Sequence, residues 1–334
     1  MKTLTNENGL AAFDSHKSLG RRSPASTPGD PFVQDILTIT NSKIFIRLAR
    51  KTQVFNPYLP VANRLTHTLQ VMAVATELSA RLKLNTPLVQ AASLLHDCGH
   101  TVISHLGEQT LSALTGKNFR HEIMSVNLAI ASGLNLSYET LKAAYLHSRG
   151  DKRMETRGGP EDNIVMFADK LAYVFTDIED ALKMKVIDEE SINKVKGFLD
   201  QRACIEAMIK ESLKQGEVSF QFSEEAKIFS DLKDMMHVIY KRVDLTEGRQ
   251  KQKVEMIELF EHLGAYREYL KVDPVLAIAL MNDQEMHDSF LIMQRPNIGS
   301  FEAIGNMPWK ELHDEFIGIK IFEPDLSPDD FLRG

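Results

Sequence analysis

Cysteine is scarce in this sequence of 334 residues, which contains only Cys98 and Cys204, and neither belongs to a CxxC pair. Two cysteines cannot form the disulfide framework of a small secreted domain, so we expect a reducing, cytoplasmic compartment. The first thirty residues are polar, and no apolar segment follows Arg21 and Arg22, so we expect no signal peptide or export signal. No apolar run is long enough to span a membrane, so we expect no membrane insertion.

Three further patterns are absent. No stretch shows sustained alternation of polar and apolar residues, which argues against β-strands. There is no GxxxxGK[ST] phosphate-binding loop, and there is no internal repeat or heptad pattern. The net charge of −7 argues against general nucleic-acid binding, although local basic patches can still face a phosphorylated small molecule.

Apolar residues instead recur at helical spacing from Pro31 onward, so the sequence predicts an all-α fold. The segment 1–30 mixes Gly, Pro, Ser and Thr with charges, and we expect it to form a flexible N-terminal arm. Family resemblance, given below, suggests a helical core over 31–185 and a C-terminal helical region over 186–334. The predicted helices are 62–84, 87–98, 105–115, 120–132, 137–147, 161–183, 188–214, 224–244, 249–270 and 308–316.

Four residues have the side chains and the order of a metal site: His67, the adjacent pair His96 and Asp97, and Asp169. The pair closes the apolar run AASLLHDCGH, where we expect Gly99 to stop the helix. Two imidazoles and two carboxylates leave coordination positions open for water and a phosphate oxygen. A lone His-Asp dipeptide means little, but six of the eleven histidines fall between positions 67 and 147, and core histidines would not cluster in this way. The pattern therefore indicates a metal-dependent phosphohydrolase.

The helix around Asp169 has an apolar stripe formed by Ile164, Ala168, Leu171, Phe175, Ile178 and Leu182. Lys170, Tyr173 and Asp177 lie off this stripe on one shared face. Such a face is most often simply solvated. A cation, a phenol and a carboxylate next to a metal ligand are also what a nucleotide polyphosphate and its sugar hydroxyl require.

The ordered blocks RLARKTQVFNPYLPVANRLTHTLQVMAVA, LLHDCGHTVISHLGEQTL, FRHEIMSVNLAIASGLNLSYETL and MFADKLAYVFTDIEDAL resemble the HD-domain deoxynucleoside triphosphate triphosphohydrolases, the dGTPase-like family. The resemblance extends from about Pro31 to Leu182 and implies one divalent ion, Mn²⁺, Mg²⁺ or Fe²⁺, per active site. It also implies homo-oligomers, dimers or larger. The implied roles are metal ligation by His67, His96, Asp97 and Asp169, catalysis by His105 and Glu108, and substrate binding by Gln53, Arg64, His100, His121, Lys170, Tyr173 and Asp177.

Two departures from the family pattern stand out. Thr101-Val102-Ile103 replaces the usual Pro-Pro-Phe, and Phe119-Arg120-His121-Glu122 stands where FEHN is frequent. Metal binding should survive both changes. The stretch between His121 and Asp169 and the region after Leu182 look shorter than in many relatives, and both tend to shape base recognition, so the preferred base is left open.

The resemblance implies attack on the α-phosphorus and release of a deoxynucleoside and intact triphosphate. His105 lies one helical turn before Glu108, which suits proton transfer by an imidazole that a carboxylate orients. Arg149, Lys152 and Arg153 could add positive charge, although a solvated basic loop is the simpler interpretation. Two alternatives stay open: another HD-type phosphohydrolase, such as a 5'-nucleotidase or cyclic-nucleotide phosphodiesterase, and a non-catalytic metal-binding regulatory module.

Overall fold

The computed structural model describes residues 10–14, 18, 20–21, 29–55, 61–148, 158–197, 199–295, 297–327 and 329. Within these residues the chain is helical and forms no β-strand beyond isolated bridges, so the prediction of an all-α fold is confirmed. The helices are α1 (Pro31–Thr40), α2 (Lys43–Ile46), the 3-10 helix η2 (Arg47–Arg50), α3 (Arg64–Arg81), α4 (Thr86–Leu95), α5 (Ser104–Thr115), α6 (His121–Ala131), α7 (Tyr138–Leu146), α8 (Pro160–Lys183), α9 (Glu189–Lys196), α10 (Gln201–Gln215), α11 (Glu224–Asp244), α12 (Glu247–Ala265), α13 (Arg267–Leu270), α14 (Pro274–Leu280), α15 (Asp283–Met293), α16 (Ile298–Gly305) and α17 (Pro308–Phe316).

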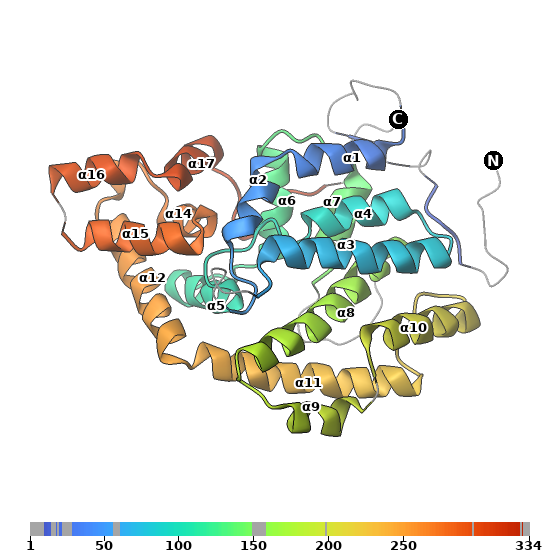
Figure 1. Cartoon of the computed structure of the whole chain (residues 1–334). Helices are drawn as coiled ribbons and strands as arrows, with labels where there is room; N and C mark the ends of the chain where they lie inside the picture. The colour runs from blue at the N-terminus through green and yellow to red at the C-terminus, as the bar shows by residue number, and fades with distance from the viewer. Residues whose placement is uncertain are drawn as a thin grey trace.

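The helices form one continuous body (Figure 1). Helix α3 packs against α4 and along α8, and α4 also contacts α1 and α7. Helix α11 lies against α8 and α9, and α12 leads from the end of α11 to the group formed by α14, α15, α16 and α17. The C-terminal third of the chain therefore extends along two sides of the bundle that contains α3, α4 and α8.

The two helices that carry the outer predicted ligands have well-defined beginnings. Helix α3 starts with a capping box, in which the Asn63 side chain accepts from the Thr66 backbone N–H at 2.9 Å and the Thr66 hydroxyl accepts from the Asn63 N–H at 2.9 Å. Helix α8 starts at Pro160, whose fixed φ suits a first helical position. These caps fix the register of each helix and hence the face that each ligand occupies.

The predicted helix 87–98 is shorter than expected, because α4 ends at Leu95 and not at Gly99. The backbone N–H of Cys98 donates to the Leu95 carbonyl at 3.0 Å, and His100 N–H donates to the Asp97 carbonyl at 3.1 Å. These tight turns replace the α-helical pattern. The prediction that Gly99 stops the helix was therefore wrong, and the His-Asp pair belongs to a turn.

Two predicted helices are each divided. The helix expected over 188–214 is α9 and α10, separated at Gly197, whose φ of +54° lies in the left-handed region. The helix expected over 249–270 is α12 and α13, separated at Tyr266. Helices α1, α2, α14, α15 and α16 were not predicted.

Two apolar clusters form the interior. The first joins α1, α2 and α4–α7 to α12 and α14–α17, and it contains the fully buried Trp309. The second joins α3 and α8 to α10 and α11, and it contains the buried Phe167 and Phe229. Each cluster draws residues from both sides of the predicted boundary at 185/186, so burial of the C-terminal helices completes the core around the bundle.

Parts of the predicted N-terminal arm are attached to this core. Leu10 is buried in the second cluster, and Arg21 forms an ion pair of 2.6 Å with the fully buried Asp35 of α1. These two residues are anchored. Most of the remaining segment 1–30 lies outside the described residues.

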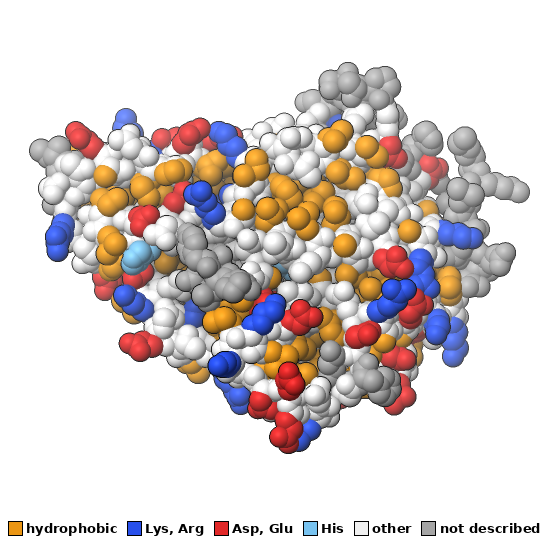
Figure 2. All heavy atoms as spheres, viewed as in Figure 1, with side chains coloured by type: hydrophobic (Ala, Val, Ile, Leu, Met, Phe, Trp, Pro, Cys, Tyr) orange, Lys and Arg blue, Asp and Glu red, His pale blue; other side chains and the backbone are white. Residues whose placement is uncertain are grey.

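Apolar side chains gather over α1, α2 and α3 on the face seen in Figure 2. The large exposed apolar side chains of these helices are Val33, Leu37, Ile46 and Leu69. None of the helices in the described part of the chain combines the length and apolarity needed to cross a membrane.

Candidate active site

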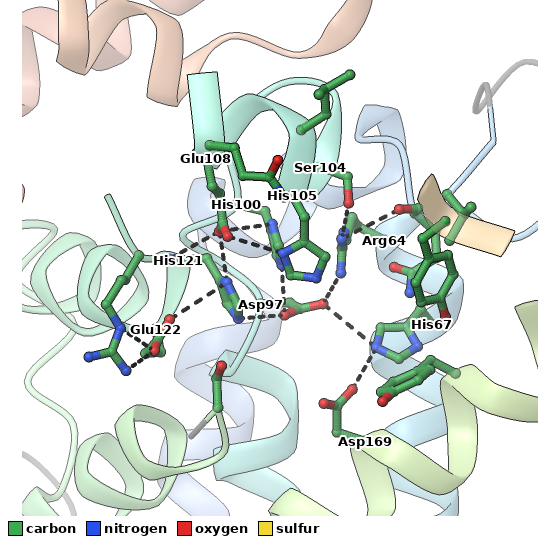
Figure 3. Close-up of a pocket in the computed structure, with 18 of the residues that line it drawn as sticks. Arg64, His67, Asp97, His100, Ser104, His105, Glu108, His121, Glu122 and Asp169 are labelled. Atoms are coloured by element: carbon green, nitrogen blue, oxygen red, sulfur yellow. Dashed lines mark hydrogen bonds and ion pairs between the residues drawn. The ribbon is translucent and has the colours of Figure 1, made fainter. Parts of the chain in front are cut away.

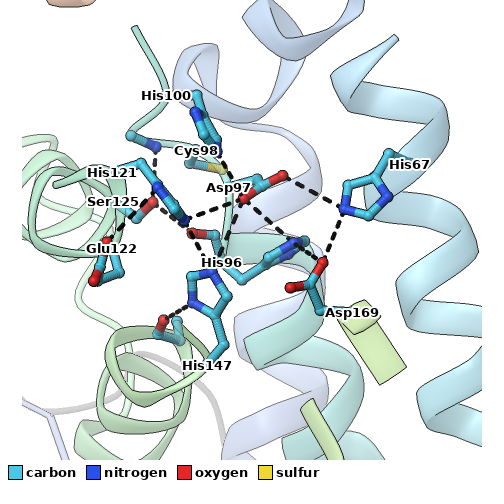
Figure 4. Close-up of polar contacts among 12 residues, drawn as sticks. His67, His96, Asp97, Cys98, His100, His121, Glu122, Ser125, His147 and Asp169 are labelled. Atoms are coloured by element: carbon cyan, nitrogen blue, oxygen red, sulfur yellow. Dashed lines mark hydrogen bonds and ion pairs between the residues drawn. The ribbon is translucent and has the colours of Figure 1, made fainter. Parts of the chain in front are cut away.

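The four predicted metal ligands converge, although His67 and Asp169 are 102 residues apart in sequence. His67 lies on α3, His96 and Asp97 follow α4, and Asp169 lies on α8 (Figures 3 and 4). Nε2 of His67 is 3.1 Å from Oδ1 of Asp169, and Nε2 of His96 is 3.8 Å from the same oxygen. One ion can therefore contact atoms from α3, from α8 and from the turn after α4.

Asp97 occupies a position between two groups of side chains. His67, His96 and Asp169 each offer one atom within 4.8 Å of the others, and His96, Asp97 and His147 form a second such set. Oδ2 of Asp97 is 3.7 Å from Nε2 of His67. Oδ1 of Asp97 is 3.4 Å from Nε2 of His96. Oδ2 of Asp97 thus faces His67, and Oδ1 faces His96.

The turn that carries the His-Asp pair is held against α6. The Gly99 N–H donates to the Ser125 hydroxyl at 2.7 Å, and this hydroxyl donates to the His96 carbonyl at 2.7 Å. A Cβ at position 99 would lie 2.2 Å from both the His121 carbonyl oxygen and the Ser125 nitrogen. Only glycine permits this approach, which explains the glycine in the sequence block HDCGH.

The protonation of His96 suits metal binding. Its Nδ1 donates to the Ser93 carbonyl at 2.7 Å, so the lone pair is on Nε2, which is buried and has no hydrogen-bond partner among the residues that the structure describes. Burial lowers the pKa of His96 and keeps the ring neutral. Burial acts to raise the pKa of Asp97, but His96 and Arg64 more than offset it and hold that pKa well below its usual range. A divalent cation would satisfy both the orphaned nitrogen and the carboxylate, so the residues fit a metal ion.

Arg64, predicted to contact phosphate, lies beside the ligands. Its Nη1 donates to Oδ2 of Asp97 at 2.7 Å and its Nη2 donates to the Ser104 hydroxyl at 2.6 Å (Figure 3). The side chain is buried but lines the cavity. Arg64 therefore holds the Asp97 carboxylate in place and adds positive charge beside the predicted metal ligands.

Glu108 on α5 connects the other predicted histidines. Its Oε2 is 3.0 Å from Nδ1 of His105, and its Oε1 is 2.7 Å from Nδ1 of His121 and 3.4 Å from Nδ1 of His100. Burial acts to raise the pKa of Glu108, but His121 and His100 hold it well below its usual range. The rings of His100 and His121 stack at 3.9 Å. His105 is the outermost member, with 59% of its side chain exposed.

The start of α5 has an unusual backbone. Ile103 and Ser104 have φ values of +47° and +60°, which are costly for a β-branched residue. The Ile103 N–H donates to Oδ1 of Asp283 at 2.9 Å, so the beginning of α15 holds this conformation. A Cβ at Gly107 would lie 1.9 Å from the Val102 carbonyl oxygen, so α5 packs closely on its own approach segment. This backbone conformation directs the side chains of His105 and Glu108 toward the metal-binding residues.

These groups line a cavity of about 1190 Å³. All the predicted catalytic and substrate-binding residues line it, as do three of the four predicted metal ligands: His67, Asp97 and Asp169. Sequence reasoning missed the contribution of α11 and α12, which add Lys233, His237, Tyr240, Lys241, Asp244 and Arg249. It also left His147 unassigned. No local motif marks the residues of α11 and α12, whereas His147 belongs to the histidine-rich stretch.

Asp177 has a hydrogen-bond partner on α11. The Tyr240 hydroxyl donates to Oδ2 of Asp177 at 2.6 Å, and the Tyr173 ring lies 6.5 Å from the Tyr240 ring. Burial raises the pKa of Asp177 to about 6. Gln53 is also buried, and its Oε1 has no hydrogen-bond partner among the described residues. These polar groups form one wall of the cavity.

Comparison with known proteins identifies the family. A deoxyguanosinetriphosphate triphosphohydrolase-like protein from Clostridium tetani is 32% identical over 256 residues, which cover 69% of this chain and 72% of that protein. The chain belongs to the dGTPase-like family. The HD domain family matches residues 64–174, which include all four predicted metal ligands of this dGTPase-like protein.

Other relatives show how far the similarity extends. A dGTPase-like protein from Clostridium perfringens is 38% identical over 173 residues, which cover 49% of this chain and 50% of that protein. The chain thus spans about half the length of several curated relatives that it matches. A crystal structure of a hypothetical protein from Aquifex aeolicus has a TM-score of 0.50 at 20% identity, covering 81% of this chain and 70% of the other, and it supports the fold alone.

Most cavity residues outside the HD match belong to the C-terminal helices of this dGTPase-like chain. Three basic residues considered from the sequence, Arg149, Lys152 and Arg153, lie outside the described residues. The family membership and the His and Asp cluster together support a metal-dependent phosphohydrolase.

Proposed function

We propose that this protein hydrolyses deoxynucleoside triphosphates to deoxynucleosides and inorganic triphosphate in a metal-dependent reaction. The observation that carries the proposal is the convergence of His67, His96 and Asp169 within 4.8 Å, with Asp97 alongside, in residues that line a cavity of about 1190 Å³ or lie just beneath it. The names of the relatives, deoxyguanosinetriphosphate triphosphohydrolase-like proteins, support this substrate class. The volume is large enough for a nucleotide with its phosphates.

The metal ligands in this proposal are His67, His96, Asp97 and Asp169. A divalent ion bound there supplies Lewis acidity toward an α-phosphate oxygen and a template for the attacking water. Mn²⁺, Mg²⁺ and Fe²⁺ all accept nitrogen and oxygen ligands of this kind. The ionised Asp97 and the neutral His96 match the protonation states that such an ion requires.

His105 and Glu108 move the proton in the proposed reaction. Glu108 accepts from Nδ1 of His105, which leaves Nε2 of this exposed ring to exchange a proton with water or with the leaving 5' oxygen. Glu108 stays ionised and orients the His105 ring through this hydrogen bond. Water attacks the α-phosphorus, the bond from phosphorus to the 5' oxygen breaks, and that oxygen takes up a proton.

The remaining cavity residues bind the substrate in this proposal. Arg64, His100, His121 and Lys170 face the phosphates, and Gln53, Tyr173 and Asp177 face the sugar. The Tyr240 hydroxyl donates to Asp177, and this carboxylate can also accept a hydrogen bond from a sugar hydroxyl. Lys233, Lys241 and Arg249 line the same cavity and add positive charge, which a triphosphate needs in a chain of net charge −7.

Product identification tests the proposal. Purified protein is incubated with each of the four dNTPs, with and without Mn²⁺, and the products are separated by chromatography. We expect deoxynucleoside and intact triphosphate, formed only with metal, and no products from the Asp97→Ala variant. Orthophosphate as the first product or cleavage of cyclic nucleotides alone would contradict the proposal in favour of another phosphohydrolase. A folded, metal-loaded protein without any turnover would favour a regulatory module.

The wider organisation of the protein belongs to the same proposal. Residues 31–185 form the HD core and residues 186–334 form the C-terminal helical region that completes the cavity. The dGTPase-like resemblance predicts homo-oligomers, so light scattering should give a mass that is a multiple of 37.7 kDa. A mass of one chain at working concentration would contradict this expectation.

A further inference from the structure

Lys51 lies in the interior of the protein, although no step of the proposed reaction uses it. It directly follows η2, and its side chain is among the largest that are fully buried. Burial and the charge of Arg47 hold the pKa of this lysine well below its usual range, so its surroundings disfavour the ammonium charge. An apolar side chain of similar length would pack here without that penalty. The contacts of the amino group therefore indicate what the lysine does.

The amino group of Lys51 holds the chain against the end of α14. Its Nζ donates to the Ala279 carbonyl at 3.1 Å, in the last turn of that helix. The same carbonyl accepts from Nη1 of Arg47 at 3.2 Å. The last carbonyl groups of a helix have no partner within the helix, so a buried helix end needs donors of this kind. Lys51 is thus attached to a residue 228 positions further along the chain.

The segment 51–54, which belongs to no helix, is attached to the C-terminal helices at two further points. The Thr52 N–H donates to Oδ2 of Asp283 at 3.0 Å, at the start of α15. The Val54 carbonyl accepts from Nη2 of Arg249, near the start of α12. The C-terminal helices therefore hold this segment at its beginning, in its middle and at its end.

The other side of the segment contacts the active site. The carbonyls of Lys51 and Thr52 accept from the backbone N–H and from Nε of Arg64, each at 3.1 Å. Arg64 in turn donates to Oδ2 of Asp97 at 2.7 Å. Gln53 is buried and lines the cavity, and its Oε1 has no hydrogen-bond partner among the described residues. The position of the Gln53 amide oxygen therefore depends on the backbone that carries it.

We propose that Lys51 is a positioning residue for substrate binding, which fixes the segment 51–54 against α14 and thereby orients Gln53 and Arg64. The inference rests on the proposed function, in which Gln53 faces the sugar and Arg64 faces the phosphates. Lys51 does not line the cavity, so it acts on the substrate only through these neighbours. This part of the substrate site is then shaped from the C-terminal helices.

A purely stabilising role is the competing explanation, because Lys51 also satisfies a carbonyl at the buried end of α14. In that case its removal lowers the free energy of unfolding and leaves the substrate affinity of the folded molecules unchanged. The two explanations differ in the KM of a folded variant. They also differ in whether the effect of Lys51 depends on Gln53.

Steady-state kinetics of the full chain with Mn²⁺ distinguish the two explanations. Lys51→Met keeps the length of the side chain and removes the donor. We expect this variant to keep its metal content and to raise the KM for an accepted dNTP about tenfold, roughly the effect of losing one substrate hydrogen bond, with a smaller change in kcat. Lys51→Arg retains a donor and should recover part of the loss. Lys43→Met removes an exposed lysine that pairs with Glu311, and it should leave KM unchanged.

A double-mutant cycle tests the route of the effect. Lys51→Met should raise KM far less in a Gln53→Ala chain than in the wild type, and circular dichroism with thermal melting verifies that each variant is folded. If Lys51→Met does not fold at the assay temperature, Lys51→Gln replaces it, because its shorter side chain removes the contact but stays polar. A wild-type KM in the folded, metal-loaded variant would overturn the inference, and so would an equal effect in both backgrounds.

The same variants keep this inference apart from the proposed function. Orthophosphate as the first product from a nucleotide would contradict the triphosphohydrolase, and the cycle measured on that nucleotide would still show whether Lys51 acts through Gln53. Triphosphate release without coupling between Lys51 and Gln53 would contradict this inference and leave the proposed function intact.

Discussion

At the scale of single residues, the site depends on partners that lie outside the cluster of ligands. The Ser93 carbonyl fixes the tautomer of His96, and the Ala144 carbonyl fixes that of His147. Each partner directs an Nε2 lone pair inward. Backbone carbonyl groups thus establish the orientation of these lone pairs before any ion binds.

Substitution of His105 tests catalysis independently of metal binding. His105 lies outside the proposed set of metal ligands, so His105→Ala should keep its metal and its KM while kcat falls by roughly a hundredfold to ten-thousandfold. Glu108→Gln should also lower kcat, and because Glu108 contacts three histidines it should disturb His121 as well. Steady-state kinetics with metal analysis measures both effects. Near-normal kcat in folded, metal-loaded His105→Ala would remove this residue from the mechanism.

Asp177 predicts a pH dependence of stability. Its pKa is raised to about 6 by burial, from an ordinary value of 3.8, so the folded state binds the proton more tightly than the unfolded state. The resulting stabilisation is fully present below about pH 4 and is lost as the pH rises through 6. The free energy of unfolding of the wild type, relative to Asp177→Asn, should fall by about 1 kcal/mol between pH 5 and pH 7. Urea denaturation measures it, and a difference that is constant across this range would contradict the assignment.

At the scale of elements, close backbone approaches position the ligands. The turn after α4 touches α6 only because position 99 lacks a side chain. Gly99→Ala should force the turn away from α6, lower the free energy of unfolding by about 1–3 kcal/mol and weaken metal binding. Gly248→Ala on α12 is the matched control, since nothing lies within 4 Å of its Cβ position. Equal stability and metal affinity in the two variants would show that this contact does not position the pair.

Sequence patterns identify elements best where a helix has one apolar face. Helix α8 was predicted almost to its ends because Ile164, Leu171 and Ile178 form a clear stripe above polar residues. Helix α14 was missed because its sequence PVLAIAL is apolar on all sides and lacks such a contrast. The division of α9 from α10 was missed because Gly197 interrupts a pattern that otherwise continues.

In the site, too, some residues belong to recognisable sequence patterns and others are brought together only by the packing of the fold. The ligands on α3, on α8 and in the turn after α4 occur in blocks that the resemblance identifies, and the structure brings their side chains together. Tyr240 lies 63 residues beyond Asp177, and no local pattern links the two. His147 was visible as one of a group of histidines, but its contact with His121 depends on how α6 and α7 pack, which a sequence without its fold does not contain.

At the scale of the whole molecule, the C-terminal helices hold the loop between α4 and α5. Arg47 donates to the carbonyls of Cys98 and His100 with Nη2 and to that of Leu280 with Nη1. Asp283 accepts from the backbone N–H groups of Thr52 and Ile103. Residues from three distant parts of the chain therefore meet behind the active site.

Removal of Asp283 tests this connection. Asp283→Ala leaves two buried N–H groups without an acceptor, at about 1–3 kcal/mol each, and releases the strained backbone at Ile103. We expect a large loss of thermal stability and a lower kcat. Asp288→Ala on the same helix removes an exposed bond to Gln284 and should change neither. Similar melting temperatures for the two variants would contradict the role of Asp283.

The most direct test of the proposed reaction is hydrolysis of a dNTP in water labelled with heavy oxygen. Attack on the α-phosphorus with loss of the 5' oxygen predicts that the label appears in the triphosphate product and that the deoxynucleoside carries none. Mass spectrometry of both products decides the matter. Label in the deoxynucleoside, or in orthophosphate formed as the first product, would contradict the account.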